Sequence, residues 1–107
     1  MRRTTSPPTL SIIIPIYNER ETLRQRLHTL QALPYDECLF VDGGSSDGSR
    51  EHLQQAGASW LRSDKGRAVQ MNHGAAHSTG DLLLFLHIDT DINTGGIAAM
   101  REAMNDE

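Results

Sequence analysis

The sequence is poor in cysteine, in basic residues and in long apolar segments, and each shortage excludes a class of protein. A single cysteine, Cys38, leaves no intramolecular disulfide, which fits a reducing compartment. No apolar run approaches the ~20 residues of a membrane span, and no signal peptide follows Met1, so we expect a cytoplasmic protein without a membrane span. The 10 basic residues are outnumbered by 14 acidic ones and form no stripe, which disfavours nucleic acid as a partner.

What the chain does have is a regular alternation of strand and helix patterns. Short apolar runs bounded by turn residues predict strands at 10–16, 38–41, 58–61 and 82–86, and such continuous runs are typical of strands buried on both faces. Helical patterns follow at 19–33, 49–56, 66–77 and 97–104. This βα repetition predicts one α/β domain with a parallel sheet over residues 10–107, preceded by a flexible lead-in at 1–9.

Local signals refine these helices and strands. Asn18 is the expected N-cap of the first helix, and Pro15 is expected near the end of the first strand, at a break in the ladder. Two apolar faces are expected to point inward. They consist of Leu23, Leu27, Leu30 and Leu33 in the first helix, and of Ala68, Met71, Ala75 and Ala76 in the third.

Polar clusters follow three of the predicted strands directly. They are Tyr17-Asn18-Glu19, the loop from Asp42 to Gly48, and His87-Ile88-Asp89-Thr90-Asp91. Because ligands of open parallel sheets bind outside the carboxyl ends of the strands, we expect a ligand site where these clusters converge.

Four segments in this order resemble the successive motifs of family 2 glycosyltransferases. They are SIIIPIYNE, VDGGSSDGS, KGRAVQMNHGA and GDLLLFLHIDT, and the last is similar to a bacterial subgroup with His-x-Asp-Thr in place of Asp-x-Asp. The second segment departs from the commoner Asp-Asp-Gly-Ser form by having Gly43 at the second acid. The resemblance covers 10 to about 104, the amino-terminal, nucleotide-binding half of such enzymes. It implies a truncated GT-A fold, a Rossmann-like three-layer α/β/α sandwich with a parallel sheet of about four strands in the order 3-2-1-4.

The resemblance also implies roles in binding a nucleoside-diphosphate sugar, with a UDP-type donor favoured. Tyr17 would line the base pocket. Glu19 would accept a hydrogen bond from a ribose hydroxyl, and Asp42 would accept one from the N3–H of a uracil-type base. Arg67 would reach the ribose or pyrophosphate. Structural roles compete with these, because residues such as Glu19 also cap helices and most surface cations are simply solvated.

Other polar residues have a simpler interpretation. Asp47 is expected to cap the following helix or to satisfy the loop backbone, and Gln70 is expected to have a structural role. His73 and His77 are four residues apart on a helix, which is a metal-compatible spacing. With no third ligand near in sequence, they are expected to be exposed helix histidines.

The acidic loop after the fourth strand is the expected site of Mn²⁺ or Mg²⁺. Two registers remain open, one with His87 and Asp89 as ligands and one with Asp89 and Asp91, and Asp89 belongs to both. Hard cations of this kind neutralise a departing diphosphate. A competing interpretation is an Asx turn built on Asp89 or Asn93.

Three functional classes therefore remain open from the sequence. The family's catalytic base and acceptor-binding elements lie in the carboxyl-terminal half, so the acceptor is unknown and no catalytic residue is assigned. The chain is expected to be a glycosyltransferase or a fragment of one, with a stand-alone nucleotide-binding module and an assembly domain as alternatives. The apolar strand at 82–86 has no Pro or Lys to blunt its edge, which predicts a homo-oligomer.

Overall fold

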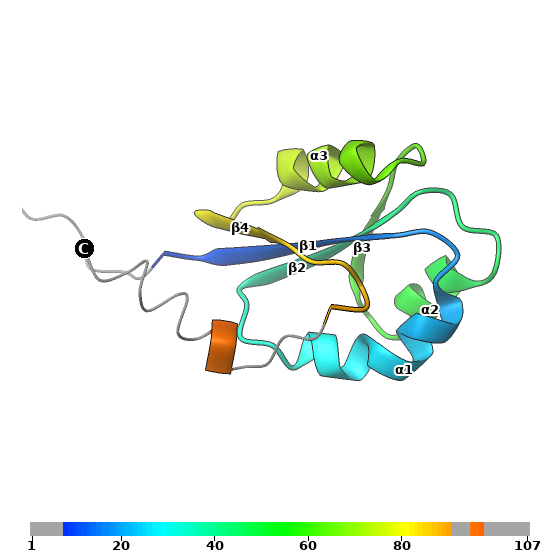
Figure 1. Ribbon diagram of the computed structural model, residues 1–107, viewed down its shortest axis with the longest axis horizontal. Helices are drawn as coiled ribbons and strands as arrows, with labels where there is room; N and C mark the ends of the chain where they lie inside the picture. The colour runs from blue at the N-terminus through cyan, green and yellow to red at the C-terminus, as the bar shows by residue number, and fades with distance from the viewer. Residues whose placement is uncertain (1–7, 91–94, 98–107) are drawn as a thin grey trace, which may run out of the picture.

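The part of the chain that the structure describes forms a four-stranded parallel sheet with helices on both faces (Figure 1). The structure, a computed structural model, describes residues 8–90 and 95–97. The sheet order is β3-β2-β1-β4, which confirms the predicted order 3-2-1-4. In chain order the elements are β1 (Leu10–Ile16), α1 (Arg20–Gln31), β2 (Glu37–Asp42), α2 (Ser49–Gln55), β3 (Ser59–Arg62), α3 (Arg67–His77) and β4 (Leu82–Phe85).

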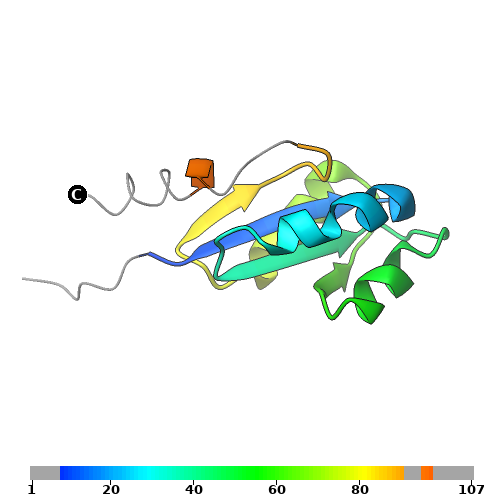
Figure 2. The same cartoon turned by 90° about the horizontal axis from the view of Figure 1, so that it is seen from below.

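The helices divide into two layers, which confirms the three-layer sandwich. Helices α1 and α2 cover one face of the sheet and α3 covers the other (Figures 1 and 2). The larger core lies on the α1 side, where the predicted leucine stripe of α1 is buried against alternate residues of β1. Ile97, in the short described helical segment 95–97, also joins this core. The remainder of the helix expected at 97–104 lies outside the described residues, as does most of the expected lead-in.

Strand β4 departs from the expectation of burial on both faces. Leu82 and Leu84 pack against the larger core, but Leu83 and Phe85 are 42% and 44% exposed on the opposite face. The reason is the placement of α3, which packs mainly against β1 and β2 and leaves the α3 side of β4 uncovered. None of the helices in the described part of the chain is long and apolar enough to cross a membrane.

Helix α3 approaches the sheet with a different face from the one expected. Ala68 and Ala76 are exposed, whereas Gln70 and Gly74 are buried, so the predicted inward face is wrong in these positions. A Cβ at Gly74 would lie 2.5 Å from Ile13 Cγ2, which is closer than packed atoms allow. The close approach therefore selects glycine at the contact, and Ala68 and Ala76 remain at the surface.

The first helix is capped from a distant loop and not by Asn18, which corrects that expectation. Asn18 has a positive φ of 52° and lies outside the helix, whose N-cap is Glu19 without a side-chain cap. The Arg20 N–H donates instead to Oδ2 of Asp47, whose Oδ1 accepts from the Ser49 N–H and hydroxyl. Asp47 thus satisfies the loop backbone, as predicted. Its slight burial acts to raise the pKa, but these hydrogen bonds outweigh burial and lower the pKa of Asp47.

Pro15 marks the point where β4 separates from β1, as its missing N–H predicted. The pairing of β4 with β1 ends at Phe85 and Ile13, with one further hydrogen bond from the Leu86 N–H to the Ile13 carbonyl. Proline two residues later cannot donate to a continuing strand. The chain after Leu86 therefore leaves the sheet and carries His87 across the end of β1.

The single cysteine packs in the hydrophobic core. Cys38 on β2 is 9% exposed within the larger core, and burial, with the nearby Glu37 carboxylate, raises the pKa of the thiol to about 12. Its protonated, buried state agrees with the packing role expected for a lone cysteine in a strand.

Candidate functional site

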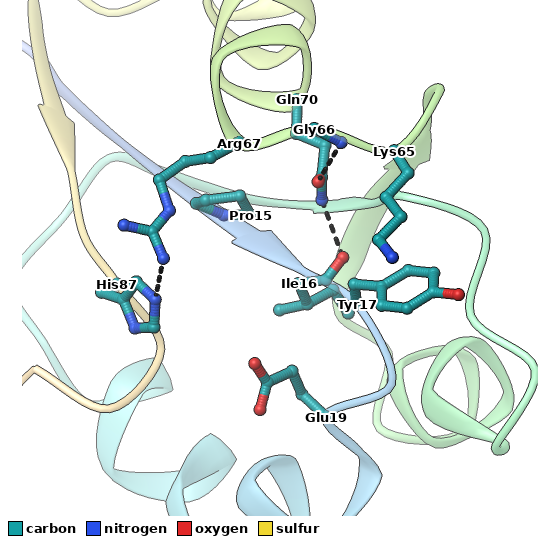
Figure 3. A pocket seen from close by; sticks show the side chains of 9 residues that line it. All are labelled: Pro15, Ile16, Tyr17, Glu19, Lys65, Gly66, Arg67, Gln70 and His87. Carbon is teal, nitrogen blue, oxygen red and sulfur yellow. Dashed lines mark hydrogen bonds between the residues drawn. The ribbon is translucent and has the colours of Figure 1, made fainter.

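A pocket opens at the carboxyl end of the sheet, where the sequence predicted a ligand site. It lies between the end of β1, the loop that opens α3 and the segment that follows β4 (Figure 3). Its lining residues are Pro15, Ile16, Tyr17, Glu19, Lys65, Gly66, Arg67, Gln70 and His87. Segments that are up to about seventy positions apart in the chain therefore meet in one cleft, which is the position that parallel sheets use for ligands.

Gln70 joins three parts of the pocket floor. Its Nε2 donates to the carbonyl oxygens of Ile16 at 2.7 Å and Val41 at 2.8 Å, and its Oε1 accepts from the Gly66 N–H at 3.1 Å. The side chain is 4% exposed, so the strand-end carbonyls are satisfied without water. A Cβ at Gly43 would lie 2.9 Å from Gln70, and this contact explains glycine where the resemblance expects a second acid. The predicted structural role of Gln70 is confirmed.

The charged side chains around the pocket favour binding of an anionic ligand that also carries hydroxyl groups. Lys65 and Arg67 contribute two cations from the start of α3, and Glu19 contributes one carboxylate from the start of α1 (Figure 3). The Lys65 ammonium lies 4.2 Å from the centre of the Tyr17 ring, a cation–π contact. A planar base can therefore stack on Tyr17 only on the opposite face of the ring or after Lys65 moves. Lys65 is not among the site residues expected from the sequence, because its contact with the Tyr17 ring has no signature there.

His87 links Arg67 to Asp89 in a chain of two hydrogen bonds. Nη2 of Arg67 lies 2.5 Å from Nε2 of His87, and Nδ1 of His87 lies 2.6 Å from Oδ1 of Asp89. Because a guanidinium can only donate, Nε2 is the acceptor, and Nδ1 carries the proton that is donated to Asp89. Arg67 and His87 thus meet in the pocket, with Asp89 immediately behind them.

The loop that carries His87 and Asp89 is held by α1. Arg26 donates from Nε to the Ile88 carbonyl at 2.9 Å and from Nη2 to the Thr90 carbonyl at 2.6 Å. Ile88 is buried in the larger core, and the Thr90 N–H donates to the His87 carbonyl, which closes a tight turn. Sequence reasoning did not single out Arg26, because nothing in a helical arginine indicates which distant carbonyls it will reach.

Asp42 is placed apart from the other predicted site residues. It is fully buried and is not among the lining residues. Its Oδ2 accepts from the N–H groups of Gly44 at 3.0 Å and Ser45 at 2.9 Å, its Oδ1 accepts from the Ser45 hydroxyl, and Arg50 Nε lies 3.7 Å from Oδ2. In this arrangement the Asp42 carboxylate stabilises the conformation of the loop after β2.

The remaining metal candidates do not form a complete protein site. Asp91, the second ligand of the alternative register, lies outside the described residues. His73 and His77 contact each other on α3 with ring centres 4.5 Å apart, and His77 is exposed. Within residues 8–90 and 95–97, no group of three or more His, Cys, Asp or Glu side chains is arranged to hold a metal ion.

Solved structures with this fold include two sugar transferases. The crystal structure of glucosyl-3-phosphoglycerate synthase from Mycobacterium tuberculosis, in complex with Mn²⁺, UDP and glucosyl-3-phosphoglycerate, matches with a TM-score of 0.76 at 18% identity, over 92% of this chain and 40% of that chain. The mannosyltransferase PcManGT from Pyrobaculum calidifontis, in complex with GDP-Man and Mn²⁺, matches with a TM-score of 0.72 at 20% identity, over 94% of this chain and 32% of that chain. At these identities the likeness establishes the GT-A fold.

Sequence comparison identifies the family. An uncharacterized glycosyltransferase of Mycobacterium tuberculosis (strain ATCC 25618 / H37Rv) is 38% identical over 90 residues, which cover 78% of this chain and 34% of the relative. The chain therefore spans about a third of the length of such relatives. The sequence model of glycosyl transferase family 2 matches residues 11–107, which is nearly the whole chain. The chain therefore belongs to this family.

Proposed function

We propose that residues 10–107 form the nucleotide-binding part of a glycosyltransferase. It binds a nucleoside-diphosphate sugar, of the UDP type, together with Mn²⁺ or Mg²⁺, and the sugar is transferred to an acceptor hydroxyl. The observation that carries the proposal is the pocket at the end of β1, where Arg67 contacts a histidine–aspartate pair and Lys65 adds a second cation beside Tyr17. Membership of the family supports the reaction class.

The lining residues divide by the part of the donor that they suit. Arg67 and Lys65 offer guanidinium and ammonium donors to the diphosphate, and the fork of an arginine matches phosphate oxygens. Glu19 is suited to accept from ribose hydroxyls, and the free face of Tyr17 is suited to stack on the base. Two structural neighbours were solved with Mn²⁺ and a nucleotide, one with UDP and one with GDP-Man, which supports a diphosphate–metal site with either base.

His87 and Asp89 are the proposed metal site, with His87 as the ligand and Asp89 as the carboxylate that accepts from its Nδ1 and orients the ring. Mg²⁺ and related cations in nucleotide sites are bound by one or two protein side chains, while substrate phosphates and water complete the coordination. A histidine that is oriented by a carboxylate and lies beside Arg67 fits that pattern, and the imidazole favours Mn²⁺ over Mg²⁺. When bound, the cation neutralises the charge that develops on the departing diphosphate.

A thermal-shift titration tests the proposal. UDP at 100 times its dissociation constant should stabilise the chain by about 2.7 kcal/mol, and most of this gain should require Mn²⁺. Uridine, which lacks the diphosphate, is the matched control and should give a small shift that does not depend on the metal. Equal shifts with uridine and UDP would contradict the proposed diphosphate–metal site. No shift with either would contradict nucleotide binding and favour the assembly-domain alternative.

We also propose that the chain self-associates through β4. Within the described residues β4 pairs only with β1, and its Leu83 and Phe85 side chains are exposed beside an unpaired strand edge. Light scattering coupled to gel filtration at low micromolar concentration should give a dimer or larger species. Leu83→Lys should shift it toward monomer, while Val69→Lys, an exposed apolar position on α3, should not. A wild-type monomer at that concentration would contradict association.

A further inference from the structure

The atom by which His87 would bind a cation is occupied by Arg67. A histidine ligates a metal through the lone pair of an unprotonated ring nitrogen. Because Nδ1 donates its proton to Asp89, that lone pair lies on Nε2, where Nη2 of Arg67 is 2.5 Å away (Figure 3). A guanidinium and a divalent cation cannot share one lone pair, so each excludes the other from His87.

The rest of the arrangement is already suited to metal binding. Metal-ligating histidines usually donate their second ring N–H to a carboxylate, which fixes the tautomer and the orientation of the ring. Asp89 provides this contact for His87, and the loop that carries both residues is held by Arg26. Among the described residues, the Arg67 side chain is therefore the group that must move for Nε2 to become a ligand.

Arg67 is placed to move when a diphosphate arrives. It is the first residue of α3, its side chain is exposed, and it lines the pocket beside Lys65. A diphosphate offers its fork two charged acceptor oxygens, whereas His87 offers one neutral nitrogen, and hydrogen bonds between charged groups are the stronger.

We propose that Arg67 and the divalent cation alternate at Nε2 of His87, and that the diphosphate favours the cation by taking over Arg67. The inference rests on the proposed function and adds a role for Arg67 as a positioning residue for the metal ligand. Its consequence is that part of the positive coupling between the nucleotide and the metal passes through the Arg67 side chain, in addition to the direct contact between phosphate and metal. Such couplings typically lie between 5-fold and 150-fold in affinity.

Mn²⁺ titrations followed by the electron paramagnetic resonance of the free ion test this exchange. Without nucleotide, Arg67→Ala should bind Mn²⁺ about fivefold more tightly than wild type, because Nε2 is released. With UDP, the wild type should gain affinity for Mn²⁺, and Arg67→Ala should gain less, because only the direct contact between phosphate and metal remains. Lys65→Ala is the matched control: it removes one positive charge from the same pocket but leaves the Arg67–His87 contact in place.

The outcomes separate this inference from the proposed function. If Lys65→Ala and Arg67→Ala raise Mn²⁺ affinity equally, the effect is general electrostatics, and the exchange is wrong. If UDP promotes Mn²⁺ binding in Arg67→Ala as strongly as in wild type, the exchange is wrong while the proposed function stands. If neither UDP nor Mn²⁺ binds to any variant, both are wrong.

Nuclear magnetic resonance of the His87 ring gives a readout without metal. UDP alone should shift the ¹⁵N resonance of Nε2 in the wild type, because Arg67 leaves that nitrogen, and should leave it unchanged in Arg67→Ala. An unchanged Nε2 resonance in wild-type protein saturated with UDP would overturn the exchange.

Discussion

Replacing Asp89 by alanine is expected to abolish the metal-dependent part of UDP binding and to leave the fold intact. The Asp89 side chain is 70% exposed, and the contact described for it is with His87, so its loss costs little stability. Metal binding loses a nearby negative charge and the group that orients the imidazole. Removal of the orienting partner alone typically lowers metal affinity about 10- to 100-fold. Isothermal titration with UDP, with and without Mn²⁺, measures the difference.

A charge-matched control separates this effect from the removal of a negative charge. Asp64 is exposed in the loop before α3, close to the cationic side of the pocket, and Asp64→Ala changes the net charge by the same amount. It should preserve the metal dependence of UDP binding. Equal loss in both variants, or full metal dependence in Asp89→Ala, would count against Asp89 as part of the metal site.

The same titration distinguishes the two registers of the acidic loop. If His87 and Asp89 form the metal pair, His87→Ala lowers the affinity for Mn²⁺ and Asp91→Ala does not. The reverse result would support the pair Asp89 and Asp91. The contact between His87 and Asp89 favours the first register.

Strand order and layer arrangement were predictable because they follow from alternation and from the resemblance. The burial of β4 was not, because an apolar run does not reveal how far a neighbouring helix extends over the sheet. Leu83 and Phe85 are residue types that are common in buried strands, and yet both are exposed, because α3 lies mainly over β1 and β2. Local patterns therefore predicted the elements better than the faces that each element buries.

The candidate site shows the same division. Tyr17, Glu19, Arg67 and His87 converge because parallel strands end at one edge, which the sequence indicated. The side chains that hold the site together were only partly predicted. Gln70 bonds to carbonyls from two strands, and Arg26 bonds to a loop more than sixty residues away, and such long-range contacts have no signature in the sequence.

Asp42 has two possible functions that one pair of substitutions can separate. The resemblance implies that its carboxylate accepts a hydrogen bond from a uracil-type base. In the structure, both carboxylate oxygens accept hydrogen bonds from the loop after β2, and Arg50 lies beside the carboxylate. Arg50 Nε is buried and has no hydrogen-bond partner within the described residues, so the Asp42 charge is its compensation. A loop anchor would change stability when removed, and a base contact would change nucleotide preference.

If Asp42 is the loop anchor, Asp42→Ala should lower the free energy of unfolding by about 3–5 kcal/mol, because two backbone N–H groups and the buried Nε of Arg50 lose their partner. Asp42→Asn retains an oxygen that can accept from Gly44 and Ser45, so it should lose much less. Urea denaturation monitored by the fluorescence of Trp60, on β3 beside β2, measures both. The affinities for UDP and for GDP should fall together in either variant. Unchanged stability in Asp42→Ala, with selective loss of UDP, would instead assign Asp42 to the base, because only a direct contact distinguishes uracil from guanine without disturbing the loop.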